Sequence, residues 1–186
     1  SFHQKFKAMF DKLKNEDLNR KNIDDFKKSK KNPLIFILDN IRSLHNVGSV
    51  FRNSDAFLVE KIYLCGITGV PPHKSINKAA LGSTDSVDWE YFESSYKLIL
   101  KLRENGFKIF AVEQTLNSTN LIDFCVEKGF KYVFVFGNEI KGISQEILNI
   151  VDGVIEIPQF GTKHSLNISI CSGIISWDFY TKYKGE

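Results

Sequence analysis

A glutamate stands in a glycine loop that follows an apolar run. The run over 131–137 ends in Gly137-Asn138-Glu139, and a second glycine follows at Gly142. The two glycines have the spacing of a phosphate-binding loop, but that loop requires a lysine directly after its second glycine, where this chain has isoleucine. Because Glu139 would also repel phosphate, the loop suits a neutral or cationic ligand whose base and ribose need hydrogen bonds.

Metal and hydrolase motifs are missing from the sequence. The four histidines are isolated, without the H-x-x-x-H or mixed His/Cys spacing of a zinc site. The chain has no G-x-S-x-G, and no acid partner is evident for the adjacent His164 and Ser165. No G-x-G-x-x-G follows the first expected strand. We therefore expect no bound metal.

The elements that must position these residues alternate between strand and helix patterns. Apolar runs predict strands over 34–38, 61–66, 87–91, 107–113, 131–137 and 153–158. Helical spacing predicts helices over 2–13, 16–28, 46–57, 75–82, 94–106, 121–128, 144–150 and 166–183. Asn46 and Ser75 are the expected N-caps of two of them. This alternation predicts an α/β fold with a mostly parallel sheet flanked by helices.

Ligands of parallel α/β sheets bind at the carboxyl ends of the strands. Three loops with unusual residues are expected at that edge, over 39–46, 137–142 and 158–167. The binding site is therefore expected at this edge of the sheet.

Three segments containing these loops stand in order along the chain. They are LDNIRSLHNVGSVFRNSDAF over 38–57, FGNEIKGIS over 136–144 and IEIPQFGTKHSLNISI over 155–170. Together they resemble the TrmH/SpoU-type RNA 2′-O-ribose methyltransferases of the SPOUT superfamily. KAALGSTDSVDW over 78–89 is similar to the middle segment of that family, and the likeness covers about residues 33–180. It implies S-adenosylmethionine as methyl donor and a C-terminal deep trefoil knot, which general topology rules disfavour.

The resemblance places the donor site on the later loops. Glycines would let the backbone approach the donor closely, and the loop over 158–161 would grip adenine largely with backbone groups. The positively charged sulfonium of the donor tolerates a nearby carboxylate. The residues expected to bind the donor are Phe136, Gly137, Asn138, Glu139, Gly142, Ile157, Pro158, Phe160, Ser165 and Leu166.

The resemblance also implies a catalytic set, which is Arg52, Asn46, Glu139, Ser165 and Asn167. Arg52 is its main member. A guanidinium stays protonated and is a poor base, so we expect Arg52 to bind a phosphate or ribose oxygen and favour the alkoxide. Structural roles remain open for each residue: a surface or phosphate-clamping arginine, helix caps, and an acceptor that stabilises the loop.

The charge of the chain is uneven. Residues 1–31 hold ten Lys/Arg and five Asp/Glu, whereas the remainder holds fifteen and seventeen. A basic arm suits a polyanion such as nucleic acid, although a solvated helix face fits equally well. We expect a basic helical N-terminal arm over 1–32 and a SPOUT-type methyltransferase domain over 33–186.

The expected partner is RNA. Only about 32 residues precede the first strand, which slightly favours tRNA over rRNA because rRNA-modifying relatives often carry a separate N-terminal RNA-binding domain. A homodimer is implied by the family and by the apolar side chains of the last helix, which are Ile170, Ile174, Ile175, Trp177 and Tyr180. The alternative is a catalytically silent RNA-binding protein on the same fold.

The compartment is expected to be the cytoplasm. The three cysteines lie far apart without C-x-x-C spacing, which favours free thiols in a reducing environment. We expect no signal peptide and no membrane partner, because no apolar run approaches the roughly 18 residues of a membrane span.

Overall fold

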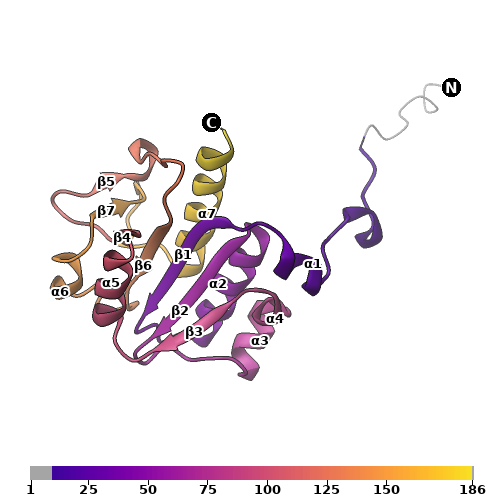
Figure 1. Ribbon diagram of the computed structural model, residues 1–186, viewed down its shortest axis with the longest axis horizontal. Helices are drawn as coiled ribbons and strands as arrows, with labels where there is room; N and C mark the ends of the chain where they lie inside the picture. The colour runs from indigo at the N-terminus through magenta and orange to yellow at the C-terminus, as the bar shows by residue number, and fades with distance from the viewer. Residues whose placement is uncertain (1–9, 186) are drawn as a thin grey trace.

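Seven parallel strands form one sheet in the computed structural model, which describes residues 10–185 (Figure 1). The strands are β1 Asn32–Asp39, β2 Val59–Cys65, β3 Trp89–Phe92, β4 Lys108–Val112, β5 Thr119–Asn120, β6 Tyr132–Phe136 and β7 Gly153–Glu156. Their order across the sheet is β3-β2-β1-β6-β4-β7-β5, and every strand pair is parallel. The predicted α/β class with a parallel sheet is therefore confirmed.

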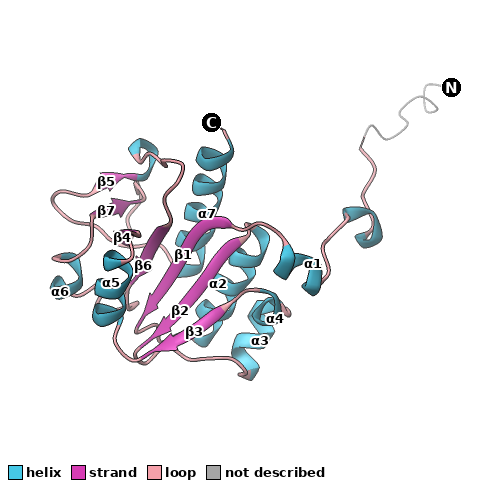
Figure 2. Cartoon of the chain, in the orientation of Figure 1, coloured by secondary structure: helices cyan, strands magenta, loops and turns pink. Residues whose placement is uncertain are grey.

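Helices cover both faces of this sheet (Figure 2). They are α1 Ile23–Lys28, α2 Leu44–Ala56, α3 Lys74–Ala80, α4 Ser83–Ser86, α5 Ser95–Glu104, α6 Gln145–Leu148 and α7 Ile168–Lys184, with short 3₁₀ turns at Asn15–Leu18 and Leu121–Asp123. Helices α2, α3 and α7 contribute to the core on one face, and α5 and α6 contribute to the core on the other. No helix in the described residues has the length and apolar character needed to span a membrane.

The alternation of side chains along β1 builds both cores. Leu34, Phe36 and Leu38 point into the cluster beneath α2 and α7, whereas Ile35 and Ile37 point into the cluster beneath α5. A strand buried on both faces requires apolar residues at every position, which explains its continuous apolar run. All five side chains are at most 2% exposed.

Chain order and spatial order differ at the centre of the sheet. Strand β6 lies between β1 and β4, so residues more than ninety positions apart in sequence pair directly. Leu38 is the register partner of Phe136 in β6, and Phe136 is in turn the partner of Val112 in β4. The loops after β1, β4 and β6 therefore leave the sheet together, as expected where the strand order reverses.

Two predicted helix caps are wrong. Helix α2 begins at Leu44, and its N-cap is Ser43, whose hydroxyl accepts the Asn46 N–H at 3.2 Å. The N-cap of α3 is His73, whose Nδ1 accepts the Ser75 N–H at 3.1 Å. In both helices the earlier residue takes the cap position, because it is the last one with extended backbone and its side chain accepts an N–H of the first turn.

The structure also differs from the predicted helices near the N-terminus and at 121–128. The predicted helix over 2–13 lies mostly outside the described residues, and 10–13 are not helical. The predicted helix over 16–28 is interrupted, because Asn19 adopts a left-handed φ of 49° between the 3₁₀ turn and α1. Only the 3₁₀ turn over Leu121–Asp123 forms in the other segment.

Candidate functional site

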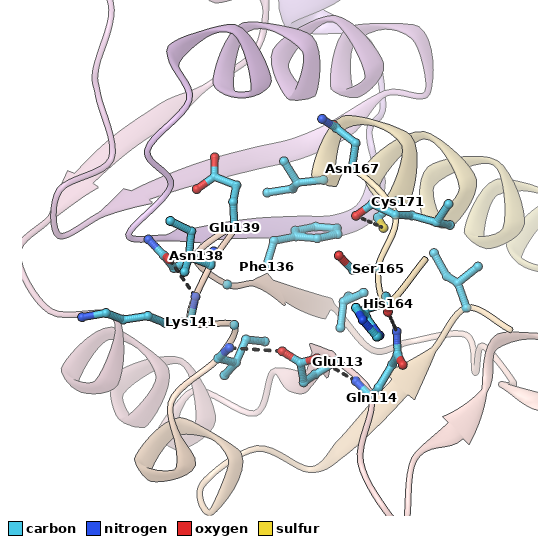
Figure 3. Close-up of a pocket in the computed structure, with 18 of the residues that line it drawn as sticks. Glu113, Gln114, Phe136, Asn138, Glu139, Lys141, His164, Ser165, Asn167 and Cys171 are labelled. Atoms are coloured by element: carbon cyan, nitrogen blue, oxygen red, sulfur yellow. Dashed lines mark hydrogen bonds between the residues drawn. The ribbon is translucent and has the colours of Figure 1, made fainter. Parts of the chain in front are cut away.

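A cavity of about 710 Å³ opens at the carboxyl ends of β4, β6 and β7 (Figure 3). We call it the main cavity. Its walls are the loop after β4 (113–115), the loop after β6 (137–143) and the segment between β7 and α7 (157–167). Val112, Phe136 and Ile155 line it where their strands end. Cavities of this size accommodate nucleoside-sized ligands, and apolar walls with a few polar groups are typical of them.

The loop after β6 is held in one shape by its own residues. Asn138 Oδ1 accepts the N–H groups of Ile140 and Lys141 at 3.0 and 2.9 Å, and the Gly142 N–H donates to the Asn138 carbonyl at 2.8 Å. A Cβ on Gly137 would lie 2.5 Å from the Gly142 carbonyl carbon, so only glycine fits there. The sequence therefore uses glycine to bring two backbone segments together at the cavity wall.

Glu139 ties this loop to the start of α2. Its carboxylate accepts the N–H groups of Arg42 and Ser43, each at 2.9 Å, and the side-chain amide of Asn46 at 3.2 Å. Burial alone would raise the pKa of the Glu139 carboxyl, but these donors outweigh it and hold the pKa below its usual value. Glu139 is therefore ionised at neutral pH, and its acceptor positions are largely occupied.

Asn138 adds a second tie between the same two loops. Its Nδ2 donates to the carbonyl of Asn40 at 2.7 Å. Together with Glu139, this bond joins the loop after β6 to the loop after β1. Of the expected loop over 39–46, Asn46 is the residue that lines the main cavity.

A second carboxylate, Glu113, lies on the cavity wall below Glu139 (Figure 3). Its carboxylate accepts the N–H groups of Gln114 at 2.8 Å and Ile143 at 3.2 Å. Gln114 in turn donates its side-chain amide to the carbonyl of His164 at 2.7 Å. The loop after β4 therefore connects the other two walls of the main cavity.

The first turn of α7 closes the remaining side. Asn167 is its N-cap, and its Oδ1 accepts the N–H and the hydroxyl of Ser169 at 2.8 and 2.7 Å. Cys171 also lines the cavity, and burial raises the pKa of its thiol to about 11. That thiol stays protonated at neutral pH and is a poor nucleophile.

Most of the residues expected to bind the donor meet at this cavity. Eight of the ten line it, which are Phe136, Gly137, Asn138, Glu139, Gly142, Ile157, Ser165 and Leu166. Pro158 and Phe160 do not, and the Phe160 side chain is 95% exposed.

The expected catalytic residues divide between two places. Asn46, Glu139, Ser165 and Asn167 line the main cavity. Arg52 instead lines a smaller cavity of about 440 Å³ between α2, α3 and the start of α7. Asn53 joins the helices there, because its side-chain amide donates to the Ser169 carbonyl at 2.7 Å and to the Ser172 hydroxyl at 2.9 Å.

Sequence reasoning missed the wall that the loop after β4 contributes. Glu113 was assigned to the end of a strand, whereas the strand ends at Val112. The rule that ligands bind at the carboxyl ends of parallel strands could have identified it, because this loop also leaves that edge. The other polar residues of the cavity wall that were not among the expected site residues are Gln114, Thr115, Lys141, Gln145, Gln159, His164 and Cys171. In the described part of the chain, no three His, Cys, Asp or Glu side chains cluster as metal ligands would.

Comparison with known proteins finds relatives that are RNA methyltransferases. The family model described as "SpoU rRNA Methylase family" matches residues 33–177. A tRNA (guanosine(18)-2′-O)-methyltransferase of Aquifex aeolicus is 33% identical over 146 residues, which are 78% of this chain and 67% of that protein. The chain spans 58 to 65% of the length of the next curated relatives.

Solved structures show the same fold. The crystal structure of the A. aeolicus TrmH/SpoU tRNA modifying enzyme superposes with a TM-score of 0.76 and 30% identity, covering 88% of this chain and 81% of that one. An AdoMet-bound rRNA methyltransferase from Sinorhizobium meliloti superposes with a TM-score of 0.75, over 83% of this chain and 58% of that one. Its identity is 24%, so it supports the fold alone.

Proposed function

The chain belongs to the SpoU rRNA methylase family, and we propose that it transfers a methyl group from S-adenosylmethionine to a ribose 2′-hydroxyl in structured RNA. One observation carries the proposal. Three loops that lie within the family match, and are separated in sequence, converge on one cavity of nucleoside size. A relative that is 33% identical is a 2′-O-methyltransferase of tRNA guanosine.

The main cavity fits the chemistry of this donor. Two carboxylates, Glu113 and Glu139, face a ligand with a positive sulfonium and ammonium, whereas a triphosphate would be repelled. Backbone groups of the loop over 137–142 and of the segment after Ile157 are available to the adenine and ribose. When bound, the donor supplies the methyl group, whose bond to sulfur breaks as its bond to the ribose oxygen forms.

Arg52 is proposed to act on the acceptor. Its guanidinium stays charged, so it would bind a phosphate or ribose oxygen and stabilise negative charge on the 2′-oxygen. Glu139 is a poor base in this scheme, because its pKa is lowered and its oxygens already accept three donors. The proton of the hydroxyl would leave to a phosphate or to water, while Asn46, Ser165 and Asn167 shape the acceptor side of the cavity.

The preferred acceptor class is tRNA, with rRNA as the second candidate. The names of the curated relative at 33% identity and of the enzyme in the solved structure at 30% identity both give tRNA as the RNA that is modified. We propose a cytoplasmic enzyme. The domain organisation proposed is a basic arm over 1–32 followed by the methyltransferase domain over 33–186.

We also propose a homodimer and a C-terminal trefoil knot. The knot is supported by membership of the family. The dimer is supported by α7, which leaves Ile170, Ile174 and Trp177 exposed at 53%, 36% and 56%. These three residues follow helical spacing and form one apolar face on the outside of the sheet layer.

Methyl transfer to defined RNA pools tests the proposed activity. The full chain is incubated with tritiated S-adenosylmethionine and either tRNA or rRNA from cells that lack the gene, and the methylated nucleotide is mapped. We expect a 2′-O-methyl mark in the tRNA pool, and donor binding by calorimetry. RNA binding without transfer or donor binding would instead support the alternative, a catalytically silent RNA-binding protein.

A further inference from the structure

A groove lies beside the main cavity, between α2 and α3. We call it the α2–α3 groove, and its volume is about 440 Å³. Its lining residues are His45, Ser49, Arg52 and Asn53 on α2, Lys78 and Ala79 on α3 with Leu81 at its end, and Ser169 and Ile170 on α7. The two helices touch through their backbones, because a Cβ on Gly48 would lie 2.3 Å from the Ile76 carbonyl oxygen. Lys78 and Arg52 are therefore carried by rigid, closely packed elements (Figure 1).

The groove holds positive charge without a counterion. None of the described residues that line it is acidic. Arg52 and Lys78 are both exposed, and neither side chain makes an ion pair or a hydrogen bond with another residue in the described part of the chain. By contrast, Lys61, Lys108 and Lys131 each pair with a glutamate at 2.5–2.9 Å.

The groove adjoins the main cavity through the first turn of α7. Asn53 holds the Ser169 carbonyl, and the Ser169 hydroxyl donates to Asn167 Oδ1. Ser169 lines the groove, whereas Asn167 lines the main cavity. A nucleotide that presents its ribose at Asn167 therefore has its backbone within reach of the groove.

We propose that the α2–α3 groove binds one phosphate of the RNA backbone next to the acceptor ribose, and that Lys78 is a positioning residue that holds this phosphate with Arg52. The inference rests on the proposed function. A guanidinium offers a planar pair of donors and an ammonium adds a point charge, a combination that suits the tetrahedral oxygens of a phosphate. Leu81, which is 66% exposed, gives the groove an apolar side for the adjoining sugar or base.

A matched pair of lysine variants tests this placement. Lys78→Gln and Lys74→Gln remove the same charge from the same helix, but Lys74 does not line the groove. The probe is tRNA from cells that lack the gene, bound to the full chain over a range of salt concentrations. We expect Lys78→Gln to weaken tRNA binding about tenfold and to reduce the slope of log affinity against log salt by about one. Lys74→Gln should stay within about twofold of the wild type, because charge effects across solvent are screened.

Steady-state kinetics of the Lys78 variants distinguish a positioning role of Lys78 from a role in folding. Lys78→Gln should raise the KM for tRNA while kcat falls less, and Lys78→Arg should restore both. Donor affinity by calorimetry and the thermal midpoint should match the wild type. Equal effects of the two glutamine variants, or a loss of donor affinity in Lys78→Gln alone, would overturn the inference. A wild type that binds tRNA but methylates no RNA would reject the proposed function instead, and the salt slopes would still decide whether the groove binds phosphate.

Discussion

Glu139 shows how one carboxylate can serve structure and site together. It accepts two backbone N–H groups at the start of α2 and one side-chain amide, and it also lines the main cavity. These donors sit at a helix N-terminus, where negative charge is favourable. The residue therefore fixes the geometry between two loops before any ligand is present.

Replacing Glu139 with glutamine should weaken the fold in a pH-dependent way. The NH₂ of the glutamine amide would face one of the N–H donors and cannot accept its hydrogen bond. We therefore expect the free energy of unfolding at pH 7 to fall by about 1 kcal/mol. The pKa of the carboxyl is lowered in the folded state, so its stabilising contribution is complete above the unfolded pKa, about 4.3, and is lost as pH falls through the folded pKa. The difference between Glu139→Gln and wild type in urea unfolding should accordingly shrink below about pH 4. Glu104→Gln, an exposed acid on α5, serves as control and should change little at either pH.

Arg52→Ala should abolish methyl transfer while donor binding survives. Arg52 lines the groove rather than the main cavity, so its removal leaves the donor walls intact. Loss of one preorganised charge-stabilising donor costs on the order of 100- to 1,000-fold in turnover. Arg52→Lys should rescue poorly, because an ammonium lacks the planar two-pronged geometry. Tritium transfer with saturating RNA, beside calorimetry with the donor, measures both effects. Near-normal turnover of Arg52→Ala would show that Arg52 is not catalytic.

At the scale of elements, the contact between α2 and α3 positions the groove. Gly48 is buried on α2, and its missing side chain lets the backbone of α3 approach closely. Arg52 on α2 and Lys78 on α3 line the same groove, so this backbone contact sets the spacing of the two helices that carry them.

Gly48→Ala should therefore destabilise the protein and separate these helices. The added Cβ would lie 2.3 Å from the Ile76 carbonyl oxygen and 2.8 Å from the Ala79 Cβ, which requires a backbone shift. Overpacking of this kind costs about 1–3 kcal/mol, measured by urea unfolding. Gly161→Ala is the matched control, because a Cβ there meets no atom within 4 Å. Equal stability of the two variants would show that α3 can move away at no cost.

The N-terminal arm has two parts, of which one packs against the core and the other extends away from it. Phe26 of α1 is 5% exposed and belongs to the core, and the ammonium of Lys31 caps that helix by donating to the Phe26 carbonyl. Residues 10–22 instead extend away from the sheet, with Phe10 and Leu13 exposed (Figure 1). Helix α1 is thus anchored, and its lysines have fixed positions beside the body.

Neutralising those lysines tests whether the arm binds RNA. Replacing Lys27 and Lys28 of α1, together with Lys30 just after it, by glutamine in the full chain should flatten the salt dependence of tRNA binding, because fewer counterions are released. All three side chains are exposed, so donor affinity should stay unchanged. Filter binding over a salt series measures the slope. A slope equal to that of the wild type would show that the segment only packs against the body.

For the whole molecule, the exposed apolar face of α7 predicts self-association. Ile175 and Phe179 are buried against the sheet at 0% and 1% exposure, so α7 has already used one face for its own core. The opposite face still carries Ile174 and Trp177, and Trp177 packs edge-on against Phe57 at a centroid distance of 6.0 Å.

Ile174→Glu should convert a dimer to a monomer. A charge in the middle of an apolar interface is costly to bury, whereas the same charge is harmless on an exposed surface. Light scattering should report a dimer for the wild type and for the control Ile122→Glu, which alters a 74% exposed residue of the 3₁₀ turn over Leu121–Asp123 rather than the exposed face of α7. A monomeric wild type at micromolar concentration would reject the dimer.

The sequence by itself determined the fold class and identified many of the residues that line the main cavity. Buried strands such as β1 and β6 are continuous apolar runs, and helices such as α5 carry a cap and a terminal glycine, so local patterns identify them. Three of the site's segments were identified because unusual residues follow predicted strands. These features depend on neighbours along the chain, and periodicity reports them directly.

Only the tertiary structure decided which loops and side chains meet. The position of β6 between β1 and β4 brings Glu139 to the start of α2 and Glu113 to the opposite wall, and no local pattern encodes that strand order. The close contact at Gly48 likewise holds the helices of Lys78 and Arg52 against each other, and Arg52 lines the groove rather than the main cavity. Long-range pairing and backbone packing arise from the whole core, so the arrangement of the charges around the two cavities became visible only in three dimensions.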